Sequence, residues 1–316
     1  MDISTKPRLV VFGAGYVGAA VACAGLARGL RVTALTRNPA KAADLAAAGV
    51  ETVVADLAGA AWHGRIASDA DYVVNCVGSG GGGAEGYRHS YLRGMRSLLA
   101  WAEGGRPGTM VYTSSTSVYP QDGGVRVDDD AAVGGGGATA GVLLEAEELL
   151  RTWARADGPP MSGVQASRGG DTPPTFHGRR AFILRLAGIY GPGRHHLLDE
   201  LRAGAAELSG SGGHHLNLIH RDDAAGAIWA ALTAPAAVAG ATFNVADTGA
   251  ATRAEVAGWL AARLGRPGPR FTGAAASGRN RVTPDRVIGS AGIRRTLGWV
   301  PAFPTFREGY EKILSR

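Results

Sequence analysis

Short runs of apolar residues alternate along the chain with longer stretches in which apolar positions recur at helical spacing. Such runs, bounded by glycine, proline and polar residues, are typical of strands buried on both faces of a parallel sheet. The predicted strands are 9–12, 31–35, 51–55, 72–77, 109–113, 181–186 and 242–245. The predicted helices lie around 16–28, 39–47, 87–101, 142–154, 222–232 and 253–264. This alternation predicts βαβ units and an α/β fold.

Two segments break this pattern. Residues 158–180 are rich in glycine and proline and hold few large apolar side chains, so we expect a flexible insert on the surface. Residues 9–27 carry no charge and are long enough to resemble a membrane span. Four glycines interrupt this second segment, which favours a strand, a turn and a helix over a single membrane helix. No membrane association is therefore expected.

Composition narrows the function classes. The chain has 316 residues, is 45% hydrophobic and carries a formal net charge of +6, which is typical of a folded globular protein. Only Lys6, Lys41 and Lys312 are lysines, and the other cations are arginines, which suit phosphate and carboxylate ligands. No basic stripe with interleaved aromatic residues is present, so nucleic acid is not an expected partner. Two cysteines cannot form a disulfide framework, and a reducing cytoplasm is predicted.

A glycine-rich turn follows the first predicted strand and opens the first predicted helix. Its Gly13, Gly15 and Gly18 match G-x-G-x-x-G, with Tyr16 and Val17 between them. In the dinucleotide-binding pattern the first glycine permits the turn, the second admits a pyrophosphate and the third lets helix and strand pack. The helix N-terminus then offers free N–H groups to the anion. This motif predicts a dinucleotide cofactor.

The end of the second predicted strand bears on which dinucleotide binds. A carboxylate there would accept a hydrogen bond from a free ribose 2′-hydroxyl, whereas an arginine would form an ion pair with a 2′-phosphate. The chain has Arg37 at this place and no carboxylate before Asp44. We therefore expect NADP(H) rather than NAD(H), the alternative being a solvated arginine at a helix start. Asp56 and Leu57 follow the third strand, where an adenine amino group could be met.

With these motifs placed, the chain resembles the NAD-dependent epimerase/dehydratase family, which belongs to the extended short-chain dehydrogenase/reductases. It resembles an atypical member of that group. The further motifs that carry the resemblance are NCVG at 75–78, TSSTSVY at 113–119, LRLAGIYGPGR at 184–194, NLIHRDD at 217–223 and LGW at 297–299. The resemblance implies a Rossmann doubly wound parallel sheet in residues 1–186, completed by strands near 217–246. It also implies a smaller C-terminal lobe, mainly residues 187–316, that binds substrate, and adds Val77 and Gly78 to the cofactor site.

The family's proton relay is missing from this chain. The resemblance places the catalytic Ser/Thr at Ser115, but Thr139 and Leu143 stand where a Tyr and a Lys four residues later are usual. No Tyr-x-x-x-Lys occurs anywhere, because none of the three lysines has a tyrosine four residues before it. Tyr91, on the helix after the fourth strand, is a candidate substitute donor. The alternative is that Tyr91 simply packs in the core together with Tyr87.

Substrate groups are expected from the loops after the sixth strand and from the C-terminal lobe. The candidates are Thr116, Arg194, His195, Asn217, Arg279 and Arg286. Family members that bind nucleotide sugars use two arginines on the diphosphate; Arg279 matches one of these places, but Leu216 occupies the other. A smaller, polar or sugar-like substrate is therefore plausible. Paired histidines are one pattern that metal sites use, but no cysteine accompanies them here, so no metal is expected.

Two function classes follow. The first is an NADP(H)-dependent oxidoreductase, epimerase or dehydratase that acts on a small polar or sugar-like molecule. The second is a non-catalytic protein that senses the NADP(H) ratio and regulates a partner, which the missing Tyr and Lys would allow. Fold resemblance alone does not separate the two. A small molecule is the expected partner in the first class, with a homodimer as a candidate assembly.

Overall fold

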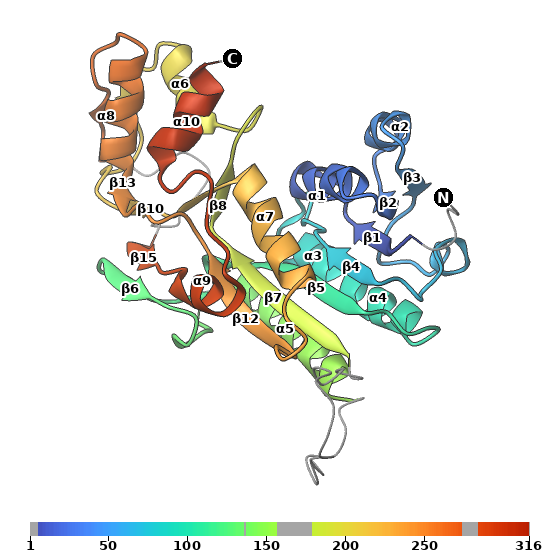
Figure 1. Cartoon of the computed structure of the whole chain (residues 1–316). Coiled ribbons are helices and arrows are strands. Elements are labelled where there is room, and N and C mark those ends of the chain that lie inside the picture. Colours follow the sequence, from blue (N-terminus) through green and yellow to red (C-terminus); the bar gives the residue numbers. More distant parts are fainter. Residues whose placement is uncertain (1–5, 136, 157–178, 274–283, 316) are drawn as a thin grey trace, which may run out of the picture.

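The computed structural model describes residues 6–135, 137–156, 179–273 and 284–315. A seven-stranded parallel sheet runs through its centre in the order β12-β7-β5-β4-β1-β2-β3 (Figure 1). All seven predicted strands are confirmed in this sheet. Their bounds are β1 Arg8–Phe12, β2 Arg31–Thr36, β3 Glu51–Val54, β4 Tyr72–Asn75, β5 Thr109–Ser115, β7 Arg180–Leu186 and β12 Gly240–Val245. The order reverses between β1 and β4, which makes this a doubly wound α/β fold of the Rossmann type.

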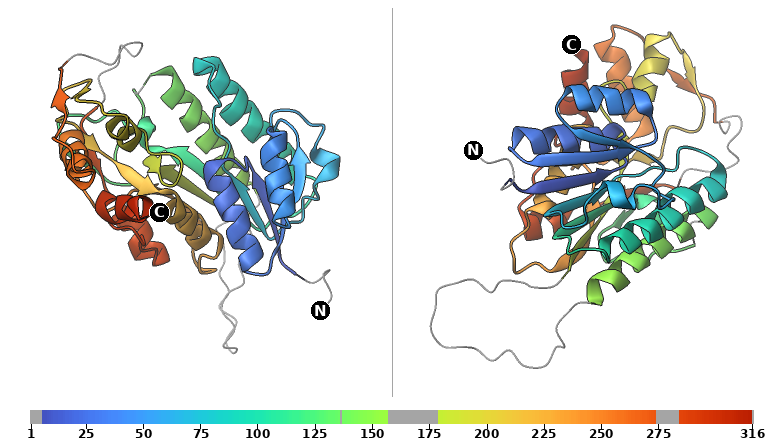
Figure 2. Two further views of the ribbon diagram at one scale, coloured as in Figure 1. Left: turned by 90° about the horizontal axis from the view of Figure 1, so that it is seen from above. Right: turned by 90° about the vertical axis from the view of Figure 1, so that its right-hand side faces the viewer.

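Helices cover both faces of the sheet, so that its central strands are buried on two sides, whereas Glu51 and Val54 of the edge strand β3 stay exposed. Helices α1, α2 and α7 share one apolar cluster with the sheet, and α4 and α5 pack into a second cluster on the opposite face (Figure 2). Their bounds are α1 Tyr16–Ala27, α2 Pro39–Ala47, α4 Gly94–Ala102, α5 Ala138–Arg155 and α7 Arg221–Leu232. Among the described residues, no helix is long and apolar enough to cross a membrane.

The helix predicted at 87–101 is not one regular α-helix. It is built from α3 (Gly83–Tyr87), a π-helical turn η3 (Arg88–Arg93) and α4. A π-turn widens the helix by one residue per turn and shifts the direction of the side chains that it carries, and such turns often occur at functional sites. Tyr91 lies on this turn, so its direction could not be inferred from a regular helical period.

A smaller lobe lies beyond one end of the sheet, where α6 (His196–Arg202), α8 (Arg253–Arg263) and α10 (Phe306–Leu314) pack around their own apolar cluster (Figure 1). Of the strands expected near 217–246, β12 completes the sheet, whereas β11 (Leu218–His220) pairs with β8 (Gly188–Tyr190) outside it. The remaining elements are short. They are η2 His63–Arg65, η4 Thr116–Val118, β6 Val125–Val127, β9 Glu207–Leu208, β10 His215–Leu216, β13 Ala251–Thr252, β14 Arg270–Phe271, β15 Arg286–Ile288 and α9 Ala291–Leu297. The predicted insert at 158–180 falls almost wholly outside the described residues.

Asp247, just after β12, is a buried carboxyl group whose ionisation should oppose folding. Burial, reinforced by the carboxylates of Glu308 and Asp223 and opposed by a hydrogen bond from the Gly249 N–H, raises its pKa to about 8. The folded protein therefore retains this proton up to about pH 8, whereas the ordinary value is 3.8. Because the folded state binds the proton more tightly between these two values, stability should fall as the pH rises through that window.

Asp247→Asn is expected to stabilise the protein at about pH 8 by the order of 1–3 kcal/mol and to have little effect at about pH 4. The amide keeps the oxygen that accepts the hydrogen bond from the Gly249 N–H (3.1 Å) and removes the ionisation. Urea unfolding of both proteins at the two pH values measures this difference. An equal change in unfolding free energy at the two values would contradict the prediction.

Candidate functional site

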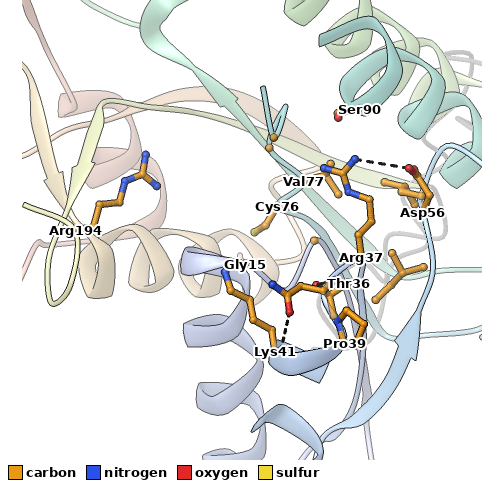
Figure 3. Close-up of a pocket in the computed structure, with 16 residues that line it drawn as sticks. Gly15, Thr36, Arg37, Pro39, Lys41, Asp56, Cys76, Val77, Ser90 and Arg194 are labelled. Carbon is orange, nitrogen blue, oxygen red and sulfur yellow. Dashed lines mark hydrogen bonds and ion pairs between the residues drawn. The ribbon is translucent and has the colours of Figure 1, made fainter. Parts of the chain in front are cut away.

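Two adjoining cavities open at the carboxyl ends of the central strands, at the point where the strand order reverses. The larger, of about 740 Å³, is lined by residues that follow β1, β2, β3 and β4 (Figure 3). The smaller, of about 310 Å³, is lined by the ends of β5 and β7, the first turn of α1 and the chain after β7. Both cavities include Cys76, Val77, Gly78 and Arg194 in their walls, so they lie side by side.

The structure brings most of the predicted cofactor residues together here. Those in the larger cavity are Gly13, Gly15, Arg37, Asp56, Leu57, Val77 and Gly78. The smaller cavity adds Tyr16 and Val17.

The glycine turn fits a dinucleotide pyrophosphate. Gly13 has φ +82°, and a Cβ there would lie 2.5 Å from the Val77 backbone nitrogen. A Cβ on Gly18 would lie 2.3 Å from the Gly13 carbonyl oxygen, so Gly18 permits close packing rather than contact with a ligand. A Cβ on Gly15 would have the Gly13 carbonyl oxygen, at 3.9 Å, as its one neighbour within 4 Å. The space at the N-terminus of α1 is therefore open. No side chain caps α1 and no acidic residue lies in its first turn, so its N–H groups can receive an anion.

The far end of the larger cavity is cationic. Arg37 Nη1 lies 3.7 Å from Asp56 Oδ2 (Figure 3). His89 Nε2 lies 2.9 Å from the same oxygen. Partial burial of Asp56 opposes ionisation, but the His89 hydrogen bond and the Arg37 charge hold the pKa of this carboxyl below its ordinary value. Asp56 is the one carboxylate that lines this cavity in the described part of the chain, and Lys41 lines it as well. The carboxylate therefore keeps Arg37 in place without leaving the region acidic.

Both predicted catalytic side chains, Ser115 and Tyr91, line the smaller cavity. The Ser115 hydroxyl accepts a hydrogen bond from the Ser117 N–H at 3.1 Å, which holds it at the end of β5. Tyr91 packs on Tyr87, with ring centroids 5.0 Å apart. Burial, with a further contribution from the Tyr87 phenol, raises the pKa of Tyr91 to about 12. This phenol stays protonated at neutral pH, so it can donate a hydrogen bond but cannot serve as a base.

Leu143, which stands at the family's lysine place, is buried in the core with 1% of its surface exposed. One turn further along α5, Glu147 is the centre of a buried polar network. Its carboxylate accepts from the Ser114 hydroxyl (2.7 Å) and from Arg185 Nε and Nη2 (3.0 and 2.7 Å). Arg185 Nη1 also donates to the Tyr119 hydroxyl at 2.9 Å. This network ties β5, α5 and β7 together through Ser114, the residue before Ser115.

Three of the predicted substrate residues have side chains engaged away from both cavities. The buried Arg286 guanidinium donates to the backbone oxygens of Tyr119 (2.7 Å) and Thr116 (3.3 Å). The Asn217 amide bonds to the backbone of Arg286 (2.9 Å) and of Ile288 (2.7 Å). The Thr116 hydroxyl donates to a backbone oxygen of β7 at 3.4 Å. These side chains hold β15 and the C-terminal lobe against the end of β5.

Of the other predicted substrate residues, His195 pairs with a neighbouring carboxylate and Arg194 lines the site. His195 Nδ1 lies 2.8 Å from Asp199 Oδ1 at the start of α6, and Arg279 lies outside the described residues. Arg194 alone of this set lines the cavities. No group of three or more His, Cys, Asp or Glu side chains in the described ranges is placed to hold a metal ion.

Sequence reasoning did not identify Lys41 or Cys76 as lining residues, although both are in the wall of the larger cavity. Lys41 could have been found, because Asn38 caps α2 by accepting from the Lys41 N–H (3.1 Å) and so places this lysine one turn from Arg37. Cys76 directly follows β4. Burial raises its thiol pKa to about 12 despite a hydrogen bond with Thr113, so this thiol is not a nucleophile at neutral pH.

Known proteins share the sequence pattern and the fold of this chain. Residues 9–246 match the family model of the NAD dependent epimerase/dehydratase family. Protein YeeZ of Escherichia coli K12 is 28% identical over 214 residues, which span 68% of this chain and 65% of that protein, just under two thirds of its length. A Methylobacillus flagellatus structure, described as a candidate NAD-dependent epimerase/dehydratase, has 25% identity, a TM-score of 0.71 and 98% coverage of both chains. UDP-glucuronic acid 4-epimerase from Bacillus cereus, solved with a UDP-sugar analogue and NAD, has 18% identity and a TM-score of 0.77 over 98% of this chain and 99% of that one.

Proposed function

Because the chain belongs to the NAD-dependent epimerase/dehydratase family, we propose that it is an NADP(H)-dependent oxidoreductase, epimerase or dehydratase. Its substrate in this proposal is a small polar or sugar-like molecule. The dinucleotide would occupy the larger cavity, with its diphosphate over Gly15 and its nicotinamide in the smaller cavity. A bound nicotinamide supplies hydride transfer, and the protein supplies orientation and hydrogen bonds.

The preference for the phosphorylated cofactor is carried by one observation: Arg37 faces the larger cavity directly after β2, in a region where Lys41 adds a second cation. A ribose 2′-phosphate carries a negative charge that a guanidinium can bind through two parallel hydrogen bonds. The unphosphorylated cofactor has no 2′-phosphate, so neither cation would add much to its binding affinity. The Bacillus cereus neighbour is a complex with NAD, so the preference proposed here rests on this chain's own residues.

On the substrate side, Ser115 is the hydroxyl best placed to hold a substrate oxygen in the smaller cavity. The Tyr91 phenol, with its pKa raised to about 12, would donate a hydrogen bond to the same oxygen and remain protonated throughout. The buried Glu147 network beneath β5 limits the movement of the Ser115 backbone. This arrangement supports polarisation of a carbonyl or hydroxyl group without the usual tyrosine–lysine relay.

Ser115→Ala should lower kcat by about 10²–10³-fold, because one hydrogen bond to the charge that develops on the substrate oxygen is lost. Tyr91→Phe should lower kcat by about 10²-fold, because the hydrogen bond that the phenol donates to the same substrate oxygen is lost. The absorbance of the reduced nicotinamide, followed over a panel of small carbonyl and sugar substrates, measures both. Tyr87→Phe is the matched control, since it keeps the ring that packs on Tyr91. Full turnover of Tyr91→Phe would exclude a catalytic phenol.

A second candidate function is favoured by Leu143, which fills the lysine place with a core side chain. In this alternative the protein binds NADP(H), does not turn over and changes its affinity for a partner with the redox state of the cofactor. Tight cofactor binding with no turnover across the panel, and unchanged behaviour of Ser115→Ala, would favour this reading. Assembly as a homodimer and location in the cytoplasm stay predictions from the sequence.

A further inference from the structure

The chain after β8 forms a tight turn that is fastened to the first residue of α1. The Gly191 N–H donates to the Arg194 oxygen (3.1 Å) and the Arg194 N–H donates to the Gly191 oxygen (3.0 Å), which closes the turn. The Tyr16 hydroxyl donates to the Pro192 oxygen at 2.9 Å. Gly191 leaves no room for a side chain, because a Cβ there would lie 2.7 Å from the Tyr16 oxygen. The turn therefore has a fixed position over the N-terminus of α1.

Arg194 is the charged side chain of this turn, and its guanidinium lies over the Tyr16 ring, with Cζ 5.6 Å from the ring centroid. It lines the larger cavity, as Gly13 and Gly15 do, and it also lines the smaller cavity. Figure 3 shows Arg194 and the Arg37–Asp56 pair at opposite ends of the larger cavity, with Gly15 between them. Arg194 thus stands where the two cavities join.

Arg194 differs from its neighbour Arg221 in having no carboxylate partner among the described residues. Arg221 also lies on the Tyr16 ring, with Cζ 5.2 Å from its centroid, but its Nε donates to Asp222 at 2.8 Å. Arg221 is absent from the walls of both cavities as described. A solvent-accessible guanidinium that is held on an aromatic ring and has no anion of its own is suited to an anionic ligand.

We propose that Arg194 binds the cofactor's diphosphate from the side opposite the glycine turn, so that it positions the dinucleotide rather than the substrate. This inference rests on the proposed binding of a dinucleotide. The diphosphate would then lie between the backbone N–H groups at the start of α1 and the Arg194 guanidinium. The two sets of donors come from different parts of the chain. The glycine turn belongs to the sheet domain, whereas Arg194 belongs to the segment that leads into the C-terminal lobe.

Since the diphosphate is common to both cofactors, Arg194→Ala should raise the Kd for NADPH and for NADH by the same factor, about 10- to 100-fold. Arg194→Lys keeps the charge and should lie between wild type and Arg194→Ala. Arg221→Ala is the matched control and should stay within about twofold of wild type. Adenosine 2′-monophosphate, which has no diphosphate, should bind wild type and Arg194→Ala equally. Titration calorimetry measures the dinucleotides, and displacement of NADPH fluorescence measures the fragment.

Several results would overturn the assignment of Arg194. One is unchanged affinity of Arg194→Ala for both dinucleotides while the wild type binds them. Another is a loss confined to NADPH, which would place Arg194 on the 2′-phosphate. Equal losses in Arg221→Ala would attribute the effect to packing on Tyr16. If the wild type binds neither dinucleotide, the proposed function itself fails, and that outcome is distinct from these three.

Discussion

Glu147→Gln is expected to lower the free energy of unfolding by about 3–5 kcal/mol, which is large for a single substitution that keeps the side-chain shape. The Glu147 side chain is fully buried, and it accepts two hydrogen bonds from Arg185, whose side chain is 5% exposed. Burial raises the pKa of Glu147, but the hydrogen bonds and charge of Arg185 hold it below its ordinary value. The amide would leave the Arg185 guanidinium buried without its counter-charge, which is the costly step.

Glu148→Gln provides the matched control one residue further along α5. Glu148 is more than half exposed and pairs with Arg151 and Arg155 at the surface, at 3.5 and 3.2 Å. Exposed pairs contribute about 0–1 kcal/mol, so this variant should unfold close to wild type. Thermal unfolding of Glu147→Gln should shift down by about 10 °C. Equal shifts for the two variants would contradict a structural role for the buried network.

The central sheet could be predicted from the sequence because its inner strands, such as β1 and β5, are buried on both faces. Such strands are continuous apolar runs, and the runs stand out between helices whose apolar positions recur at a longer period. The π-turn at Arg88–Arg93 could not be predicted, since its extra residue is not marked by proline or by a change in polarity. The short strands of the C-terminal lobe, two or three residues long, are also below what a period of two can reveal.

That Gly13 and Arg37 would lie in one cavity was predictable for a related reason. Gly13 and Arg37 directly follow strands, so their position along the chain determines their place at the sheet edge. The substrate side was not predictable in this way. Arg286 looked like a ligand contact, yet its guanidinium donates to backbone oxygens 167 and 170 positions earlier in the chain. Contacts over such distances are set by the packing of the two lobes, which no local pattern records.

Arg37→Ala is expected to raise the Kd for NADPH by about 10- to 100-fold and to change the Kd for NADH by less than about twofold. The variant removes the guanidinium that we propose binds the 2′-phosphate, and it leaves the glycine turn intact. Asp56 loses one cation but keeps the His89 hydrogen bond at 2.9 Å, so the wall of the cavity should hold. Arg31→Ala is the control, because Arg31 begins the same strand at its other end and pairs with Glu51 at 3.6 Å.

Titration calorimetry of NADPH and NADH, on the wild type and on Arg37→Ala, tests the proposed cofactor site most directly. The wild type should bind NADPH more tightly than NADH by at least about tenfold, and Arg37→Ala should bind the two with nearly equal affinity. Equal affinities in the wild type, or a preference for NADPH that survives Arg37→Ala, would contradict the assignment of Arg37 to the 2′-phosphate.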